Sequence, residues 1–166
     1  MTVAVAVEHP SARGVADLVR EGDAHGLSLY PAESYYALDL ASLADPEVRL
    51  FVARREGVAV GIAALVLAAP GGETPEAELK RMFVAPAARG AGVATALLTT
   101  LERTAVDLGV SRLVLETGPR QPEAIALYEK HGYVRIPNFG PYINDPLSLC
   151  FAKDLSDRRS RQPSTR

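Results

Sequence analysis

The sequence predicts an α/β fold: a single domain with a mixed central sheet of about seven strands and helices on both faces. Three observations support this class. Short β-branched runs alternate with segments of helical periodicity, above all in the second half of the chain. The length of 166 residues suits one compact domain with its own core. Hydrophobic residues make up 48% of the chain and charged residues 23%, as in ordinary globular proteins.

The first third of the chain contains a strand and helical segments. Residues 2–7 are short and β-branched, which predicts a first strand. Pro10 and Ser11 are expected to open a helix, because the apolar residues that follow at 15, 18 and 19 share one helical face. The segment Gly22–Asp45 mixes aromatic residues, a proline and scattered acids, and is predicted to be a broken helical region.

The middle of the chain contains three expected strands, over residues 49–55, 58–68 and 77–84. Glu56 and Gly57 separate the first two, and a glycine at this place indicates a tight hairpin. Pro86 ends the third strand, and the turn "AARGAG" leads into a helix that Gly109 should end. The predicted apolar stripe of this helix consists of Ala94, Leu97, Leu98, Leu101, Ala105 and Leu108.

The last part of the chain continues the alternation of strand and helix. A strand is expected over 112–117, a helix over 122–131 closed by Gly132, and final strands over 133–137 and 147–155. Residues 1–155 are therefore expected to form the domain. The tail 156–166 is polar, basic and free of aromatic residues, which predicts disorder.

Composition excludes several classes of function. The net charge of −2 gives no general attraction to nucleic acid or to an anionic membrane, so an anion site must be built locally. Cys150 is the only cysteine, which excludes an internal disulfide and a cysteine metal cluster and predicts a buried, inert thiol. No metal is expected. The chain start lacks a basic leader, and no apolar run reaches the roughly 20 residues of a membrane span, so a cytoplasmic location is expected.

The segment "ARGAGVATALL", residues 88–98, places an arginine and two glycines where a helix begins. Such a turn lets backbone N–H groups converge on one point, and the helix dipole favours negative charge there. The segment lacks the Lys-Ser/Thr pair of a Walker loop and the third glycine of a dinucleotide fingerprint. A glycine-rich turn with a solvated arginine explains these residues equally well, and nucleotide binding is a weaker third alternative.

Two motifs resemble the GNAT superfamily of N-acetyltransferases. Arg89, Gly92 and Ala94 match its acyl-CoA signature, Gln/Arg-x-x-Gly-x-Gly/Ala. Downstream, "EAIALYEKHGYV" is similar to its Ala-x-x-Leu-Tyr-Glu-x-x-Gly-Phe/Tyr segment. The resemblance covers nearly all of residues 2–155. The stretches "YYALDL", "ELKRMFV", "LETG" and "GPYINDPLSLC" resemble a bacterial branch of this superfamily whose members act on small molecules and mostly lack settled substrates.

The resemblance implies acetyl-CoA as the donor, with its pyrophosphate on the N–H groups of residues 89–94. It also implies that the fourth and fifth strands splay apart, so that pantetheine fits along the end of the fourth. Where the family often has asparagine before its second motif, this chain has Gln121, which puts a side-chain contact there in doubt. The residues expected to contact the cofactor are Phe83, Val84, Arg89, Gly90, Ala91, Gly92, Val93, Ala94, Gln121 and Tyr128.

Acetyl transfer to an amine needs a base for the ammonium proton and benefits from an acid for the leaving thiolate. The resemblance implies Tyr128 as this acid; the alternative is an aromatic residue that packs on its helix. Glu78 is the candidate base, since a carboxylate near an apolar cleft suits that role; the alternative is an ordinary charge where a strand begins. Glu116 and His25 are weaker candidates for the base.

The acceptor pocket is expected from residues 26–45, the strand around Lys80 and Arg81, and the late loop "NFGPYINDP". Lys80 and Arg81 are adjacent on a strand and should point to opposite faces, so at most one would anchor a substrate carboxylate. The aromatic residues expected to line the pocket are Tyr35, Tyr36, Phe139 and Tyr142.

The reaction expected from this pattern is transfer of acetyl from acetyl-CoA to the primary amine of an amino acid or related metabolite, by direct attack in a ternary complex. A peptide or antibiotic amine stays open as the acceptor. A non-catalytic acyl-CoA sensor is the alternative from another class of function. No nucleic-acid or membrane partner is expected, and the exposed final strands make a homodimer plausible.

Overall fold

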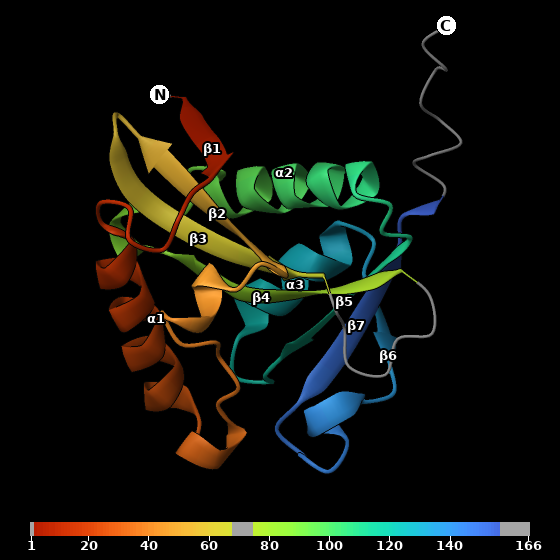
Figure 1. Ribbon diagram of the computed structural model, residues 1–166. Helices are drawn as coiled ribbons and strands as arrows, with labels where there is room; N and C mark the ends of the chain where they lie inside the picture. The colour runs from red at the N-terminus through yellow and green to blue at the C-terminus, as the bar shows by residue number, and fades with distance from the viewer. Residues whose placement is uncertain (1, 68–74, 157–166) are drawn as a thin grey trace, which may run out of the picture. The chain divides into compact units, whose positions relative to one another are not determined.

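The computed structural model describes residues 2–67 and 75–156 and contains one seven-stranded mixed sheet of order β1-β2-β3-β4-β5-β7-β6. The strands are β1 (Val3–Val7), β2 (Val48–Arg55), β3 (Val58–Val66), β4 (Glu76–Val84), β5 (Arg112–Thr117), β6 (Val134–Ile136) and β7 (Leu149–Asp154). Antiparallel pairing joins β1 to β2, β2 to β3, β5 to β7 and β6 to β7. The predicted α/β class and strand number are confirmed (Figure 1). The sheet places β4 beside β5, and their splaying stays a prediction.

The three α-helices are α1 (Val15–Leu29), α2 (Val93–Asp107) and α3 (Pro122–Lys130). The described residues form two compact units: residues 2–66 with 79–101, and residues 67, 75–78 and 102–156. The predicted disordered tail lies outside the described residues, except for Ser156. Within the described ranges, no helix has the length and apolar character needed to cross a membrane.

In the first unit, α1 and α2 cover opposite faces of β3 (Figure 1). Gly61 faces α2, because a Cβ at this position would lie 2.9 Å from Val93 and 3.0 Å from Leu97. The next residue, Ile62, belongs to the apolar cluster that includes Val15 and other α1 residues. Since neighbouring strand residues point to opposite faces, the two helices enclose the strand between them.

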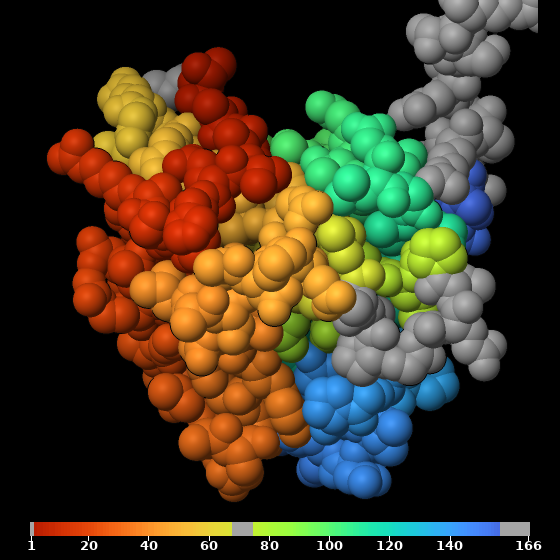
Figure 2. Space-filling view, viewed as in Figure 1, coloured from red at the N-terminus to blue at the C-terminus, as the bar shows by residue number. Residues whose placement is uncertain are grey.

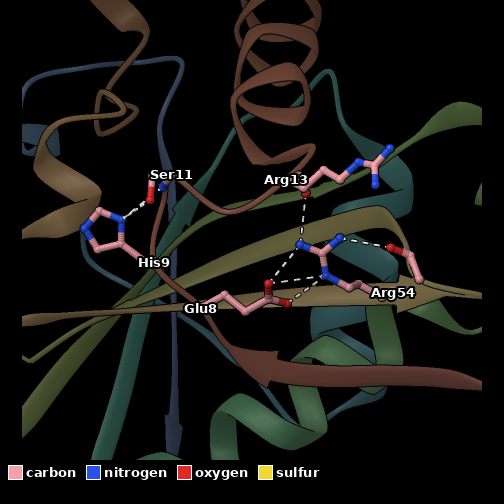
Figure 3. Close-up of polar contacts among 6 residues, drawn as sticks. Glu8, His9, Ser11, Arg13 and Arg54 are labelled. Carbon is pink, nitrogen blue, oxygen red and sulfur yellow. Dashed lines mark hydrogen bonds and ion pairs between the residues drawn. The ribbon is translucent and has the colours of Figure 1, made fainter.

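The start of α1 differs from the sequence prediction. Pro10 and Ser11 do not begin the helix, which starts at Val15 after Gly14 in the left-handed region (φ 84°). Arg54 of β2 explains the delay, because its Nη2 donates to the Arg13 carbonyl at 2.9 Å and to the Glu8 carboxylate at 2.8 Å. This bridge holds residues 8–13 as an irregular connection (Figure 3). Because this contact joins residues 41 positions apart, a local sequence pattern cannot predict it.

The broken helical region predicted over Gly22–Asp45 is confirmed, and the structure shows where it breaks. α1 continues through Gly22 and ends at Leu29, and short 3-10 turns follow at Ala32–Ser34 and Ser42–Ala44. Gly26 is tolerated inside the helix because the ring of Tyr35 occupies the space where its Cβ would lie. The hairpin expected at Glu56 and Gly57 is confirmed, with both residues at left-handed φ (52° and 80°).

In the second unit, a buried ion pair holds the end of α2. Glu102 is 1% exposed and accepts from Lys153 Nζ at 2.8 Å and from the Tyr133 hydroxyl at 2.9 Å. The sequence analysis placed Leu108 in the buried stripe of this helix, but Leu108 is 46% exposed. The stripe residues Leu97, Leu98, Leu101 and Ala105 are buried as predicted.

Candidate active site

The glycine turn of the first unit precedes α2, as the sequence predicts. Gly90 and Gly92 have left-handed φ angles of 80° and 79°, and no atom would lie within 4 Å of a Cβ at either position. α2 starts at Val93, so its first N–H groups, which lack intrahelical acceptors, adjoin this turn. The turn therefore presents exposed backbone that a ligand can approach closely.

Arg89 is held against the end of β4. Its Nε donates to the Val84 carbonyl at 3.2 Å, and its guanidinium carbon lies 5.8 Å from the centre of the Phe83 ring. The arginine is exposed and remains beside the turn. The contacts with Val84 and Phe83 hold an arginine that is still exposed to solvent, so both interpretations of the turn stay open.

These residues suit a diphosphate such as that of coenzyme A. A permanent positive charge, two glycines with open space above them and the start of a fifteen-residue helix occur within five positions. The net charge of −2 makes a diffuse positive field an inadequate explanation for anion binding. Among the predicted cofactor residues, Phe83 is half-buried at the end of β4 and Val93 is buried in the first turn of α2.

Arg81 forms a polar network with α1 and the segment that follows it. Its side chain is 4% exposed, and its Nη2 lies 2.7 Å from Asp23 Oδ1. The Nε donates to the Leu38 carbonyl at 2.7 Å, and the hydroxyl of Tyr35 donates to the same Asp23 oxygen at 2.7 Å. Arg81 adopts a left-handed φ of 61° inside β4. This network ties residues 30–45, orange in Figure 2, to α1.

The network changes how the predicted acceptor residues are interpreted. The sequence offered Lys80 or Arg81 as the carboxylate anchor, and the Arg81 guanidinium is engaged inside the protein. Tyr35 uses its hydroxyl on Asp23, and burial is the main cause that raises its pKa above 10.0. Tyr36 and Lys80 are half-buried. Asp23, the central acceptor of this network, escaped the sequence analysis because its partners lie far away in the chain.

In the second unit, Glu78 and Tyr142 form a buried pair. Glu78 is 3% exposed and Tyr142 1% exposed, and the tyrosine hydroxyl donates to Glu78 Oε2 at 2.7 Å. Burial and the neighbouring carboxylates raise the pKa of Tyr142, so its hydroxyl stays protonated as a donor. Phe139 packs its ring edge-to-face on Tyr142, with centroids 5.2 Å apart.

Glu116 lies in the same unit on β5, opposite Cys150 in the antiparallel register. Its Oε2 accepts from the Ser148 hydroxyl at 2.6 Å. Its charge acts on Tyr128, Tyr142 and Cys150, and in each case burial is the larger cause that raises the pKa. The Cys150 thiol is fully buried, as expected for an inert residue.

Tyr128 lies on α3 with a 4% exposed side chain, edge-to-face against Tyr133 at 5.6 Å. Within residues 2–67 and 75–156, its hydroxyl has no hydrogen-bond acceptor. Burial raises its pKa above 10.0, with a smaller contribution from Glu116. The structure therefore presents a protonated phenol whose proton is not donated to any described residue.

Two other candidates have clear positions. Gln121 caps the start of α3 through its backbone, and its side chain makes no capping hydrogen bond. His25 of α1 contacts the Phe83 ring at a centroid distance of 6.3 Å. The sequence analysis missed Asn138 and Ser148, whose side chains bond to the late loop and to Glu116.

Comparison with known proteins gives consistent findings. The model of the acetyltransferase (GNAT) family matches residues 16–133. A protein of Azospirillum brasilense named IAA acetyltransferase is 46% identical over 153 residues, which cover 92% of this chain and 98% of that protein. A protein of Bacillus subtilis named YsnE, an uncharacterized N-acetyltransferase, is 31% identical and covers 91% and 99% of the two chains.

Solved structures share the fold. A crystal structure of a Klebsiella pneumoniae protein superposes with a TM-score of 0.75 at 32% identity, over 92% of this chain and 97% of that one. The PaiA N-acetyltransferase of Thermoplasma acidophilum, solved in complex with coenzyme A, gives a TM-score of 0.70 over 93% and 99% of the chains. At 14% identity this second likeness concerns the fold alone.

Proposed function

The chain belongs to the acetyltransferase (GNAT) family, and from this premise we propose that it transfers acetyl from acetyl-CoA to the primary amine of a small molecule. The amine attacks directly within a ternary complex. The glycine turn before α2 carries the proposal, because it joins open backbone, a helix start and Arg89 at one place. The relative named IAA acetyltransferase supports a small-molecule acceptor.

Backbone N–H groups of residues 89–94 bind the diphosphate of the donor in this proposal. Both glycines leave space above the backbone, so a phosphate oxygen can approach without meeting a side chain. Phe83 and Val84, at the end of β4, offer the backbone groups that bind pantetheine. The bound donor supplies an acetyl thioester, whose thiol is a fair leaving group with a pKa of about 8.5.

Tyr128 protonates the leaving sulfur. Its hydroxyl is protonated at neutral pH, as any phenol is, and no described group accepts that proton. Glu78 accepts the proton of the attacking ammonium. This carboxylate is buried, which limits competition from water, and the Tyr142 hydroxyl bonds one of its oxygens.

Lys80 is the proposed anchor for an acidic acceptor. The sequence left Lys80 and Arg81 open, and the Arg81 guanidinium is bonded to Asp23 and to the Leu38 carbonyl. Tyr36 contributes an aromatic surface to this pocket. The proposed acceptor is therefore an amino acid or a related acidic amine, held by a salt bridge that a neutral ester cannot form.

The test measures thiol release from acetyl-CoA across a panel of amines that contains free acids and their esters. We expect turnover with at least one amine and faster turnover with its free acid. Lys80→Met should reduce the preference for the free acid, while Lys153→Met, which removes a lysine of the Glu102 ion pair, should leave that preference unchanged. Equal turnover of acids and esters would contradict the anchor.

Tyr128→Phe should lower kcat by about tenfold to a hundredfold, because one acid-base group contributes about 10²-fold or more. Glu78→Gln should lower kcat by a similar factor. Coenzyme A binding without thiol release for any amine would contradict the proposed reaction. Binding is measured by calorimetry on the same samples.

A further inference from the structure

The side chain of Asn138 braces the loop of residues 138–148 from within. Asn138 Nδ2 donates to the carbonyls of Tyr142 and Ser148 at 3.0 Å each, with a longer contact of 3.4 Å to the carbonyl of Asp145. Backbone bonds add to this closure, such as that from the Tyr142 N–H to the Phe139 carbonyl at 3.0 Å. The loop is therefore braced on the inside, and its residues keep fixed positions relative to one another.

This loop donates one hydroxyl hydrogen bond to each of two carboxylates. Tyr142 donates to Glu78 of β4 at 2.7 Å, and Ser148 donates to Glu116 of β5 at 2.6 Å. All these residues lie in the second unit. Hydrogen bonds to ionised acceptors are about twice as strong as neutral ones, so each donor restricts the rotation of its carboxylate.

We propose that Tyr142 is a positioning residue that fixes the carboxylate of Glu78 for proton transfer. The inference rests on the proposed function, in which Glu78 is the base. The sequence suggested a different role for Tyr142, an aromatic wall that contacts the substrate. Its side chain is 1% exposed and its hydroxyl is bonded to Glu78, which leaves little surface for a ligand.

Three features make Tyr142 suited to this role. Phe139 packs against its ring and Asn138 bonds its carbonyl, so the phenol itself is immobilised. Burial raises its pKa, so the hydroxyl remains a donor under conditions in which the enzyme works. A base held at a fixed orientation avoids the loss in rate that follows from a misplacement of about 1 Å.

The first experiment compares Tyr142→Phe with Tyr133→Phe, using acetyl-CoA and an amine identified in the panel. Tyr133 is the matched control, because it is likewise buried, at 2% exposed, and also donates to a buried carboxylate, Glu102, at 2.9 Å. We expect Tyr142→Phe to lower kcat by about tenfold and to leave the KM for acetyl-CoA unchanged. Tyr133→Phe should lower the melting temperature without this loss of kcat.

The second experiment combines Tyr142→Phe with Glu78→Gln. If the tyrosine acts through the glutamate, the double variant has the kcat of Glu78→Gln alone. Additive losses would overturn the positioning role. A normal kcat for Tyr142→Phe beside a low kcat for Glu78→Gln would overturn that role alone, whereas a normal kcat for Glu78→Gln would overturn the proposed base as well.

A third variant covers the case in which Tyr142→Phe does not fold. Asn138→Ala keeps the tyrosine hydroxyl and removes the internal brace of the loop. It should lower kcat, and it should do so only when Glu78 is present. An equal loss in the Glu78→Gln background would contradict the positioning role.

Discussion

At the scale of single residues, two glycines one turn apart in α1 have opposite surroundings. A Cβ at Gly26 would collide with the Tyr35 ring, whereas a Cβ at Gly22 would meet its nearest atom, in Phe83, at an ordinary 3.4 Å. Alanine favours a helix interior over glycine by about 0.5–1 kcal/mol. We expect Gly22→Ala to raise the free energy of unfolding by a few tenths of a kcal/mol or more and Gly26→Ala to lower it by about 1–3 kcal/mol.

Chemical denaturation of the two variants provides the measurement, and each serves as the control for the other. In a Tyr35→Ala background, Gly26→Ala should no longer lower the free energy of unfolding, because the colliding ring is then absent. Equal effects of the two alanines in the Tyr35-containing protein would contradict the assigned packing.

The neighbours Lys80 and Arg81 show a limit of residue-level prediction. Strand alternation predicts that their side chains lie on opposite faces. The left-handed φ of Arg81 interrupts the regular strand, and distant partners in α1 and at Leu38 hold its guanidinium. Such a conformation is costly for a residue with a Cβ and persists only where the surrounding contacts maintain it. Sequence periodicity contains no signal for contacts of this kind.

At the scale of elements, the turn before α2 offers a sharp test of anion binding. Gly92 and Gly57 have nearly equal φ angles of 79° and 80°, and both would have an unobstructed Cβ. Alanine therefore brings the same backbone strain to both, about 1–2 kcal/mol. Gly92→Ala should weaken coenzyme A binding by about tenfold or more, because under the proposed function the new methyl group would lie where a phosphate approaches.

Gly57→Ala should have the same loss of stability and unchanged coenzyme A affinity. Calorimetric titration of both variants measures the affinity, and thermal melting confirms that the strain is matched. A normal affinity in Gly92→Ala would place the diphosphate elsewhere.

Elements with strong local signals could be predicted, and elements fixed by distant contacts could not. The hairpin at Glu56 and Gly57 needs only its own residues, and it occurs as expected. The start of α1 depends on Arg54, and the need for glycine at position 26 of this helix comes from the ring of Tyr35. The buried Glu102 likewise depends on Lys153, a partner that a helical stripe cannot reveal.

At the scale of the whole molecule, buried tyrosines make stability sensitive to alkali. The pKa values of Tyr128 and Tyr142 are raised above 10.0, mainly by burial. In the unfolded chain both hydroxyls titrate near their ordinary value, while the folded state keeps both protons. Above pH 10.0 the folded state therefore binds more protons than the unfolded state. The contribution of the two tyrosines to the free energy of unfolding is complete below that pH and is lost as the pH rises further.

Phenolate absorbance and circular dichroism, followed together from neutral to strongly alkaline pH, check this expectation. Ionisation of the buried tyrosines should coincide with unfolding, and Tyr142→Phe should remove part of that late absorbance change. Titration of every tyrosine near pH 10.0 with the secondary structure intact would contradict it.

The sequence predicted the fold class more completely than it predicted the contacts of the candidate site residues. The α/β class and the number of strands follow from alternating short patterns, whereas the position of β7 between β5 and β6 was not predicted; the family motifs predicted roles for the turn before α2 and for Tyr128. Glu78 was predicted to be the base, which stays a prediction, and Tyr142, which donates to it, was predicted to contact the substrate. That assignment rested on aromatic character, whereas the hydroxyl's position depends on a loop braced by Asn138.

The tight packing at Gly61 has a consequence for interpreting mutational scans. The backbone oxygen of Phe83 and two side chains of α2 surround the space above this residue, at 2.9–3.3 Å. Even one added methyl group must push the helix away from the strand end with which it frames the turn. A survey of variants would thus score position 61 as sensitive even without any contact with a ligand, because a side chain there displaces residues of β4 and α2.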